Sequence, residues 1–250
     1  MRVAPLEGNV HLLAATSIFG SVEVPKASVA GLRNLVLICF TNRSGSWLLA
    51  DLLGTSGRFF VAGECLNGDE VANIAQRRRI RSFAGFFEEY LVGQAVDGNL
   101  VPKCGLPHLE ILGRSGVLDH LGARVRYVHV ERLDRLAQAI SWEIARQTQH
   151  WSSHRSHLPA PEPVYDRAGI EAAIELFAGY NHGFGTFFGL NGIVPEHVTY
   201  EALVARPAEV AEGVVAGMFA GPAGVDPAKV TFRRQAGPRN EEWRRRFLAE

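Results

Sequence analysis

The 250-residue sequence has little cysteine, no excess of either charge and no long apolar run. Its three cysteines, Cys39, Cys65 and Cys104, lie far apart and form no C-x-x-C pair. This argues against a disulfide framework and against the common zinc-binding spacings. We interpret each cysteine as core packing, and the odd number predicts reduced thiols in a cytoplasmic protein.

The charge balance and the lack of long apolar runs argue against nucleic-acid binding and membrane insertion. With 26 basic and 26 acidic residues the net charge is zero, which gives no support for nonspecific nucleic-acid binding. No apolar run reaches the roughly 20 residues that span a bilayer, so no transmembrane segment is predicted. Arg2 is followed by Pro5 and Glu7, which makes a poor secretion signal.

What the sequence does contain is an alternation of strand-like and helix-like segments. Strands are predicted at 35–41, 58–63, 99–104, 123–130 and 197–199, with 229–232 strand-like or extended. Helices are predicted at 47–53, at 70–96 with a break near Gly85, and at 107–121, 133–150, 170–188, 207–219 and 240–250. Pro102 argues against a central position for its strand. Residues 151–168 read as a loop.

This alternation predicts an α/β fold with a central, mainly parallel sheet flanked by helices on both faces. We expect a single domain over residues 34–250. Residues 1–33 read as an N-terminal extension of unknown role, forming an extra strand or helix or packing against a partner.

The most informative segment follows the first strand directly, with the residues Asn42-Arg43-Ser44-Gly45-Ser46. In a parallel sheet, ligands bind beyond the carboxyl ends of the strands, and free amides at a helix start favour a phosphate-like group. The lysine and the Gly-x-x-x-x-Gly spacing of an ATP-binding loop are missing, and Arg43 supplies the charge instead. The alternative is a helix start with no further role.

Three more motifs follow in order along the chain. They are Val130-Glu131-Arg132 before a helix that contains Ser141, the run Val198-Thr199-Tyr200-Glu201-Ala202-Leu203, and Phe232-Arg233-Arg234-Gln235 before Trp243. With the loop, they make the chain resemble the sulfotransferases that use 3′-phosphoadenosine 5′-phosphosulfate (PAPS), in particular the bacterial branch that sulfates trehalose glycolipids. The resemblance runs from about residue 35 to the C-terminus, and implies a three-layer fold like that of P-loop proteins.

The resemblance implies a nucleotide site that holds PAPS as co-substrate and its product PAP, with no metal. A donor with two anionic ends needs two positive clusters, and arginine suits bidentate contact with phosphate. Arg132 could instead be an ion-pair partner of Glu131 or Asp134. The residues implied are Arg43, Ser44, Gly45, Ser46 and Trp47 for the 5′-phosphosulfate, Arg132 and Ser141 for the 3′-phosphate, Tyr200 near adenine, and Arg233, Arg234 and Gln235 closing over the 3′-phosphate.

Sulfuryl transfer resembles phosphoryl transfer, so positioning and electrostatic stabilisation should dominate. We assign Glu64 as the base for the acceptor hydroxyl, and Lys103 with Arg43 as the groups that stabilise developing charge. His108 is the competing base, although histidine in the animal cytosolic branch lies two residues after the lysine and not five. Glu64 could instead be a helix cap or salt-bridge group, and Lys103 a surface lysine with a buried stem.

Two positions depart from the family pattern. Trp47 stands where the family loop has threonine, which removes one hydroxyl contact. Asn67 stands where the trehalose enzymes carry glutamate, although Gly63-Glu64-Cys65-Leu66-Asn67 resembles the Gly-Glu-x-x-Asn stretch of the nodulation-factor sulfotransferases.

The remaining polar clusters have weaker interpretations. The resemblance implies that the segment with His150, His154 and His157 helps to shape the acceptor site or a dimer contact. A metal site is not predicted there, since no further ligand spacing supports one. The basic run 77–81 is predicted to be a solvated helix face, with docking of an anionic partner as the minority alternative.

The function predicted is sulfuryl transfer from PAPS to a hydroxyl of a small-molecule, sugar or lipid acceptor, or of a secondary metabolite. A homodimer is left open. The alternatives are a P-loop-like kinase that uses ATP with Mg²⁺, and a non-catalytic relative that only binds the nucleotide.

Overall fold

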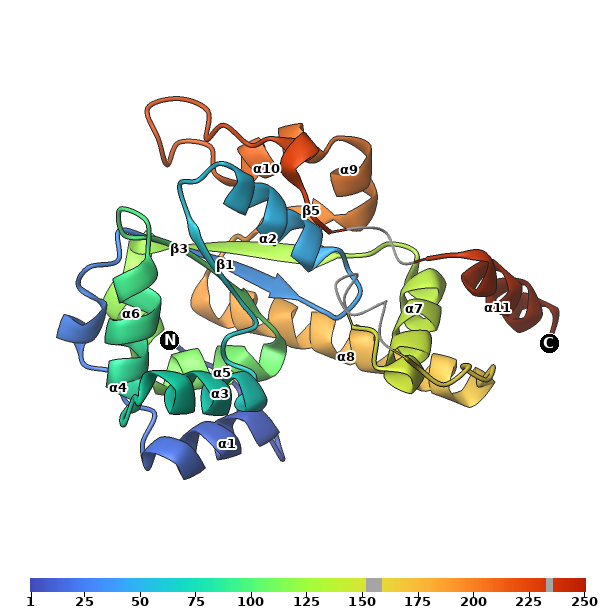
Figure 1. Ribbon diagram of the computed structural model, residues 1–250, viewed down its shortest axis with the longest axis horizontal. Coiled ribbons are helices and arrows are strands. Elements are labelled where there is room, and N and C mark those ends of the chain that lie inside the picture. Colours follow the sequence, from blue (N-terminus) through green and yellow to red (C-terminus); the bar gives the residue numbers. More distant parts are fainter. Residues whose placement is uncertain (152–158, 233–235) are drawn as a thin grey trace.

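The computed structural model describes residues 1–151, 159–232 and 236–250. Within these residues, five parallel strands form one sheet in the order β2-β3-β1-β4-β5 (Figure 1). The strands are β1 (Asn34–Phe40), β2 (Phe60–Gly63), β3 (Asn99–Cys104), β4 (Val125–Glu131) and β5 (Glu196–Thr199). The predicted α/β class with a parallel central sheet is confirmed.

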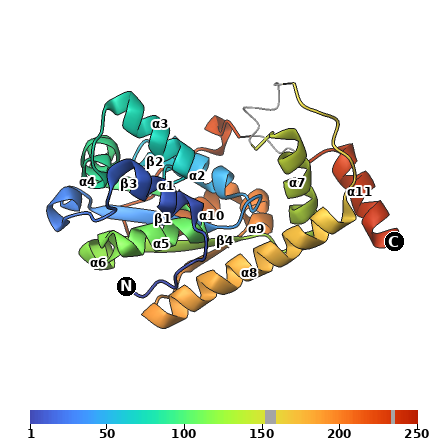
Figure 2. The same cartoon turned by 90° about the horizontal axis from the view of Figure 1, so that it is seen from below.

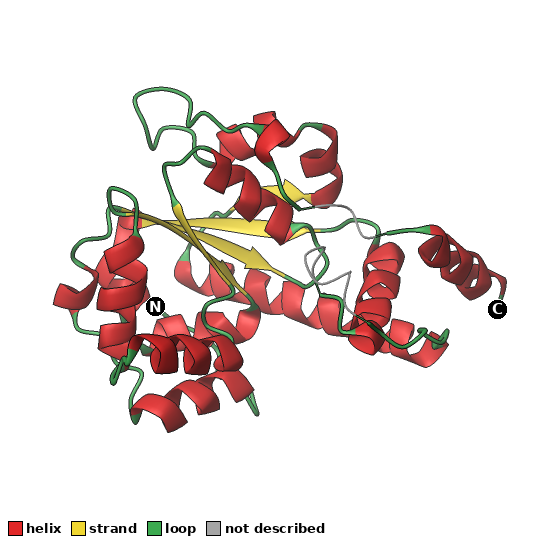
Figure 3. Ribbon diagram, in the orientation of Figure 1, coloured by secondary structure: helices red, strands yellow, loops and turns green. Residues whose placement is uncertain are grey.

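Helices cover both faces of this sheet (Figure 3). One face carries α2 (Ser46–Thr55), α9 (Tyr200–Ala205) and α10 (Pro207–Val214), and the other carries α5 (Leu106–Arg114), α6 (Val117–Leu121) and α8 (Arg167–Asn191). The other described helices are α1 (Val10–Phe19), α3 (Gly68–Arg78), α4 (Phe83–Gly85), α7 (Arg135–Thr148) and α11 (Pro238–Ala249), with a π-helix at Phe86–Val92 and short 3₁₀ helices at Lys26–Val29, Gly122–Arg124 and Pro227–Lys229.

The hydrophobic core lies on both sides of β1, because its side chains alternate between the two faces. Val36, Ile38 and Phe40 pack with the side chains of α2 and α10. Leu35, Leu37 and Cys39 pack with those of α5, α6 and α8. A strand buried on both faces reads as a continuous apolar run, which is why this strand was recognisable in the sequence.

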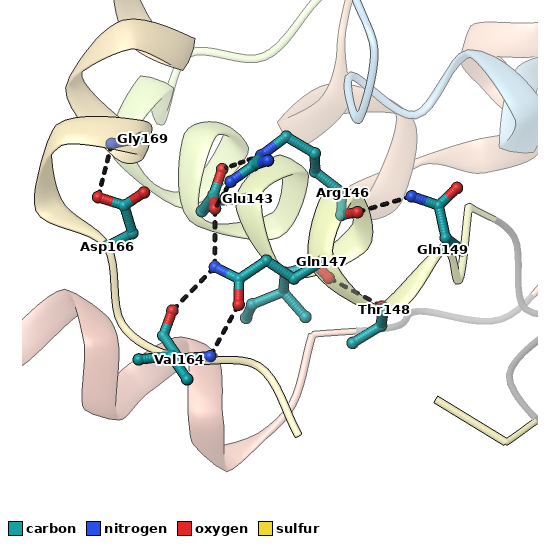
Figure 4. A network of polar contacts seen from close by, with 9 residues as sticks. Glu143, Arg146, Gln147, Thr148, Gln149, Val164, Asp166 and Gly169 are labelled. Atoms are coloured by element: carbon teal, nitrogen blue, oxygen red, sulfur yellow. Dashed lines mark hydrogen bonds and ion pairs between the residues drawn. The ribbon is translucent and has the colours of Figure 1, made fainter. Parts of the chain in front are cut away.

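A third cluster lies beyond the sheet, where α8 extends to meet α7 and α11 (Figure 2). Polar contacts reinforce this junction around Glu143 of α7, whose carboxylate accepts hydrogen bonds from Arg146 and Gln147 (Figure 4). Gln147 in turn bonds the backbone of Val164, just before α8. Although α8 has 25 residues, no helix in the described parts of the chain is long and apolar enough to cross a membrane.

Pro102 does not keep β3 at the edge of the sheet. The strand lies between β1 and β2, so the prediction drawn from this proline was wrong. The physical reason is local: Pro102 pairs with Gly63 where the register between β2 and β3 shifts, and such an irregularity tolerates a missing N–H donor.

Several helix boundaries also differ from the prediction. The segment 70–96 breaks after α3 at Arg79, whose φ of 58° is left-handed, and Gly85 lies inside the following helical stretch. Gly116, with φ of 80°, separates α5 from α6. The helix expected at 207–219 ends at Val214. Residues 229–232 form no strand. Of the two alternatives predicted for them, extended backbone is observed at Val230, after a 3₁₀ turn that ends at Lys229.

The N-terminal residues are part of the packed structure. Of the alternatives left open for them, the helix is observed: α1 packs against α3 and α5. Ala15, Val24 and Val29 are fully buried in the same cluster as the core side of β1. This packing places one face of α1 beside the site described next.

Candidate active site

The side chains singled out in the sequence gather at the carboxyl edge of the sheet. β1 lies where the strand order reverses, with β3 and β2 on one side and β4 and β5 on the other. A crevice at such a reversal is where open α/β sheets bind ligands. The segments that follow β1, β2, β4 and β5 carry four of these residues into it: Arg43, Glu64, Arg132 and Tyr200, the last at the start of α9.

The loop between β1 and α2 has the backbone of an anion-binding turn. Arg43 and Gly45 adopt left-handed conformations, with φ of 64° and 87°, which turn the chain sharply into α2. None of the described side chains caps the first turn of α2, so the dipole and amides of the helix face the crevice. Ser44 and Ser46 are buried in this turn, and the Ser44 hydroxyl has no hydrogen-bond partner among the described groups.

Arg43 links this loop to α7. Its Nε donates to the Ser141 hydroxyl at 2.9 Å, and an Nη donates to the backbone oxygen of Trp151 at 3.0 Å. Burial, together with the charge of Arg132, lowers the pKa of Arg43 to about 10. Two guanidinium groups therefore face one region, which favours an anion between them.

Tyr200 lies between the loop and Arg132. The guanidinium carbon of Arg132 stands 4.6 Å from the centre of the Tyr200 ring. A Cβ added at Gly45 would lie 2.6 Å from Cδ2 of that ring, so only glycine permits this close packing. Of the acids weighed as partners of Arg132, Glu131 pairs with Arg135, while Asp134 pairs with Arg244 and also feels the charge of Arg132, which helps to lower the pKa of Asp134.

Lys103 and Glu64 form an ion pair in the interior of the site. The Lys103 ammonium lies 2.6 Å from Glu64 Oε1, and the lysine side chain is only 1% exposed. Lys103 is therefore no surface lysine. Its nitrogen also stands 4.0 Å from the centre of the Trp47 ring and 4.3 Å from that of Phe40, a cation–π arrangement.

Trp47, which stands where the family loop has threonine, thus covers the buried Lys103 ammonium. Besides covering Lys103, its indole stacks on Phe232 with ring centres 5.2 Å apart. A Cβ on Gly63 would lie 2.6 Å from the same indole. Trp47 therefore closes off the ammonium from water, which strengthens the charge interactions of the pair.

Asn67 orients Glu64. Its side-chain amide donates to Glu64 Oε2 at 3.1 Å, while Lys103 occupies the other oxygen. Burial opposes ionisation of Glu64, but the Lys103 ammonium and the Asn67 amide hold its pKa below the ordinary value. Burial also lowers the pKa of Lys103, to about 8, with Arg43 adding to the effect and Glu64 opposing it.

His108 is buried next to this pair in its neutral form. Burial, followed by the neighbouring His11, lowers the pKa of His108 to about 3. Its Nδ1 accepts a hydrogen bond from the Gly105 amide at 3.1 Å, which assigns the ring proton to Nε2.

His11 of α1 belongs to the same site, and sequence reasoning missed it. Its ring centre lies 4.9 Å from that of His108, and its Nδ1 accepts from the amide of Gly68 at the start of α3. In the sequence, only the residue type of His11 could have indicated a role in the site. No local pattern indicates that residue 11 lies next to residue 108.

Most of these residues line one cavity of about 1420 Å³, whereas Ser44 is fully buried and does not line it. Arg132 also lines a neighbouring cavity of about 130 Å³, together with Ala236 and Asn240. Arg233, Arg234 and Gln235 lie outside the described residues, as do His154 and His157. The cavity brings together Arg43, Ser46, Trp47, Glu64, Lys103, His108, Arg132, Ser141 and Tyr200.

This set of donors fits a nucleotide with more than one anionic group. The uncapped start of α2, the unpartnered Ser44 hydroxyl and two guanidinium groups all supply hydrogen-bond donors or positive charge. Fold and site together define an α/β protein of the P-loop-like kind, with a donor-rich crevice at the carboxyl edge of its sheet.

Comparison with known proteins identifies the family. The Stf0 sulphotransferase family model matches residues 105–250, more than half of the chain, and the chain belongs to this family. Its resemblance to the sulfotransferases is thereby confirmed. Arg132, Ser141 and Tyr200 fall inside the matched region, whereas the loop at Arg43 and the Glu64–Lys103 pair precede it.

Two curated relatives are similar to this chain. The trehalose 2-sulfotransferase of Mycobacterium tuberculosis (strain ATCC 35801 / TMC 107 / Erdman) is 30% identical over 137 residues, which cover 55% of this chain and 51% of that protein. The trehalose 2-sulfotransferase of Mycolicibacterium smegmatis is 26% identical over 136 residues, covering 53% and 49% respectively. The chain thus spans about half the length of the curated relatives it matches.

Proposed function

We propose that the chain transfers the sulfuryl group of PAPS to a hydroxyl group of a carbohydrate-containing acceptor. The observation that carries this proposal is the buried Lys103–Glu64 pair, which lines the same cavity as the anion loop and Arg132. A kinase would need a lysine in the loop after β1, and this loop has Arg43 instead.

Two positive regions would hold the two ends of the donor. The start of α2, with Arg43 and Ser44, would bind the 5′-phosphosulfate, because its amides and dipole favour an anion. Arg132 and Ser141 would bind the 3′-phosphate, with Tyr200 beside the nucleoside. When bound, PAPS supplies a sulfuryl group whose bond to the phosphate oxygen breaks as an acceptor oxygen bonds to sulfur.

The two members of the ion pair, Lys103 and Glu64, would have different roles in the reaction. Lys103 is positive below its pKa of about 8, so at neutral pH it can stabilise negative charge on the transferred group and on the departing oxygen. Glu64, held as a carboxylate, would take the proton of the acceptor hydroxyl. Movement of Lys103 toward the donor would release Glu64 Oε1 for that task.

Glu64 suits the role of base better than His108. The Nδ1 atom of His108 is occupied by the Gly105 amide, so the remaining nitrogen carries a proton and can only donate. Glu64 keeps a carboxylate oriented by Asn67. We therefore assign His108 and His11 to the wall of the acceptor side of the cavity.

The acceptor side has the composition that polyhydroxyl compounds need. Asp69, Glu70 and Asn73 of α3 line the cavity with Tyr90, and their oxygens can accept hydrogen bonds from sugar hydroxyls. The ring can pack on the apolar face of a sugar. Because both relatives are trehalose 2-sulfotransferases, trehalose is the first acceptor to test.

Two measurements test this function. Calorimetry should show binding of PAP but not of ATP with Mg²⁺, because two positive regions match two separate anionic ends. Mass spectrometry of reactions with PAPS and a set of sugars that includes trehalose should then reveal an acceptor whose mass rises by one sulfuryl group. Binding of PAP with no transfer to any acceptor would point to a non-catalytic nucleotide-binding relative.

Variants separate the assigned roles. Glu64→Gln should lower kcat by about 10²–10⁴-fold while leaving the Kd for PAP nearly unchanged, because a base acts on the acceptor. Lys103→Ala should lower kcat by about 10²–10³-fold. Glu171→Gln is the matched control, since Glu171 of α8 pairs with Arg167 and does not line the cavity. Parental rates in Glu64→Gln would exclude Glu64 as the base.

A further inference from the structure

A second cluster of polar side chains lies at the β4–β5 side of the sheet, outside the cavity. His129 of β4 is the register partner of His197 on β5, and Glu131 follows two residues after His129. The three side chains therefore share one face of the sheet. It is the face covered by α8, since His129 contacts the rings of Phe184 and Phe188. Within the described parts of the chain, this is the group of three whose ligand atoms could hold a metal ion.

The distances match those of a metal site. Glu131 Oε2 lies 3.3 Å from His197 Nε2 and 3.9 Å from His129 Nδ1. All three ligand atoms lie within 4.8 Å of one another. Two ligands of a tetrahedral ion at bond lengths of about 2.0–2.1 Å stand roughly 3.3 Å apart, so small side-chain rotations suffice. The other oxygen of Glu131 is held by Arg135 at 2.8 Å, which leaves Oε2 directed at the two imidazoles.

Metal-bound histidines commonly donate their second ring N–H to an oxygen, and a side chain that can accept such a bond lies beside His129. His129 is only 5% exposed, and its Nε2 is buried without a hydrogen-bond partner among the described groups. Asn181 of α8 lies beside this ring and interacts with it, although both polar atoms of its side chain are buried without a hydrogen bond of good geometry. A metal on Nδ1 would leave the Nε2 proton to donate to the Asn181 oxygen, as metal-bound histidines commonly do.

We propose that His129, Glu131 and His197 bind a divalent first-row transition metal ion such as Zn²⁺, which clamps β5 to β4. Two imidazoles and one carboxylate form a ligand set suited to such ions. His197 is 54% exposed, so the ion can enter from solvent and keep water as its fourth ligand. β5 is an edge strand of four residues, and it leads directly into Tyr200. The clamp is separate from the sulfuryl-transfer site, for which no metal is expected.

Cobalt provides a direct test, because tetrahedral Co²⁺ gives visible absorption bands. The full chain is freed of metal with a chelator and titrated with Co²⁺, followed by displacement with Zn²⁺. We expect one equivalent to bind, with affinity falling by about 100-fold or more in His197→Gln. His182→Gln is the matched control, since His182 is an exposed histidine of α8 and should bind as the parent does. The same affinity and spectrum in parent and His197→Gln would overturn the proposal.

Thermal unfolding gives a second readout. Zn²⁺ should raise the Tm of the parent and of His182→Gln, but not that of His197→Gln or Glu131→Gln. Asn181→Leu should weaken binding by about 10–100-fold without abolishing it, since it removes only the outer hydrogen bond. Equal stabilisation of the parent and both ligand variants by Zn²⁺ would place the ion elsewhere and overturn the proposal.

Discussion

Lys103 is a cation that the fold encloses almost completely. The ammonium is compensated by Glu64 on one side and by the rings of Trp47 and Phe40 on the other. Glu64 is the more accessible member, with 21% of its side chain exposed. The two members should therefore respond differently to substitution, because only the lysine would be left with a buried and uncompensated charge.

Glu64→Gln should destabilise the protein by about 1–3 kcal/mol at neutral pH, because Lys103 loses its partner and must either stay charged in the interior or give up its proton. The double variant Glu64→Gln/Lys103→Met should recover most of that loss, since the methionine side chain packs on the same two rings. Urea unfolding of parent, single and double variants measures both changes. A single variant as stable as the parent would contradict the importance of the pair, and neither variant should regain transfer activity.

Transfer should fall as pH rises through about 8. The pKa of Lys103 is lowered to that value by burial, so its positive form exists below it and is lost above it. The lowered pKa of Glu64 keeps the base ionised throughout the neutral range, so loss of activity in acid should occur only below the ordinary carboxylate range. The measurement is kcat/KM against pH.

The variant Lys103→Arg tests whether deprotonation of Lys103 causes the loss of transfer at alkaline pH. A guanidinium stays charged in alkali, so the alkaline loss of whatever activity remains should move to higher pH. An alkaline loss at the same pH in parent and variant would assign it to a group other than Lys103.

At the scale of elements, the start of α2 depends on a close approach between segments distant in sequence. Gly45 combines a left-handed backbone with contact to the Tyr200 ring of α9. Both α9 and α2 leave the carboxyl edge of the sheet, one after β5 and the other after β1. The anion loop is thus held in place by tertiary packing as well as by its own turn.

Gly45→Ala should weaken PAP binding by at least about tenfold, equivalent to roughly 1.4 kcal/mol, because the added methyl displaces Tyr200 or the loop. Gly57→Ala is the matched control. Gly57 has φ of 66°, so it carries similar backbone strain of about 1–2 kcal/mol, but nothing lies within 4 Å of its added Cβ. Calorimetry on both variants should show loss of PAP affinity in Gly45→Ala alone. Equal losses would mean that general strain is responsible.

At the scale of the whole molecule, the candidate site joins α1, the loop after β1, the ends of β2 and β3, and the segments after β4 and β5. A ligand that contacts several of these segments at once should stabilise the entire fold. It binds the native state and not the unfolded chain, so its binding free energy adds to stability.

PAP at 100 times its Kd should stabilise the parent by about 2.7 kcal/mol, seen as a rise in Tm. AMP, which lacks the 3′-phosphate, should bind more weakly, and Arg132→Ala should remove the difference between PAP and AMP. Arg126→Ala is the control, because Arg126 lies at the opposite end of β4 and bonds the backbone of Val214 and Ala216. A PAP–AMP difference that survives Arg132→Ala would place the 3′-phosphate elsewhere.

Local patterns made much of this architecture predictable. The continuous apolar run of β1 and the small residues after it identify a strand, a turn and a helix start, and the structure has all three. Arg132, Ser141 and Tyr200 follow recognisable motifs, and the structure brings them to the cavity. Their roles as nucleotide ligands stay predictions, as do those of Arg233, Arg234 and Gln235 and the single domain at 34–250.

Other features depend on contacts that no local pattern records. In the sequence, Trp47 was only a departure from the family motif. The structure shows that its ring packs on the Lys103 ammonium. His11 lies 97 positions from the histidine beside it, and Pro102 is tolerated in the middle of the sheet because β2 shifts its register there. Such pairings arise only when separate elements fold together.

By itself, the sequence determined most of the strands and helices, though not all of their boundaries, and the family to which the chain belongs. These properties follow from side-chain periodicity and from short motifs that are contiguous along the chain. The tertiary structure alone decided that Lys103 is enclosed by Trp47, that α1 lines the cavity and that His129, Glu131 and His197 meet across two strands. The physical reason is that burial, and with it the pKa of an ionisable group, depends on every element packed around it.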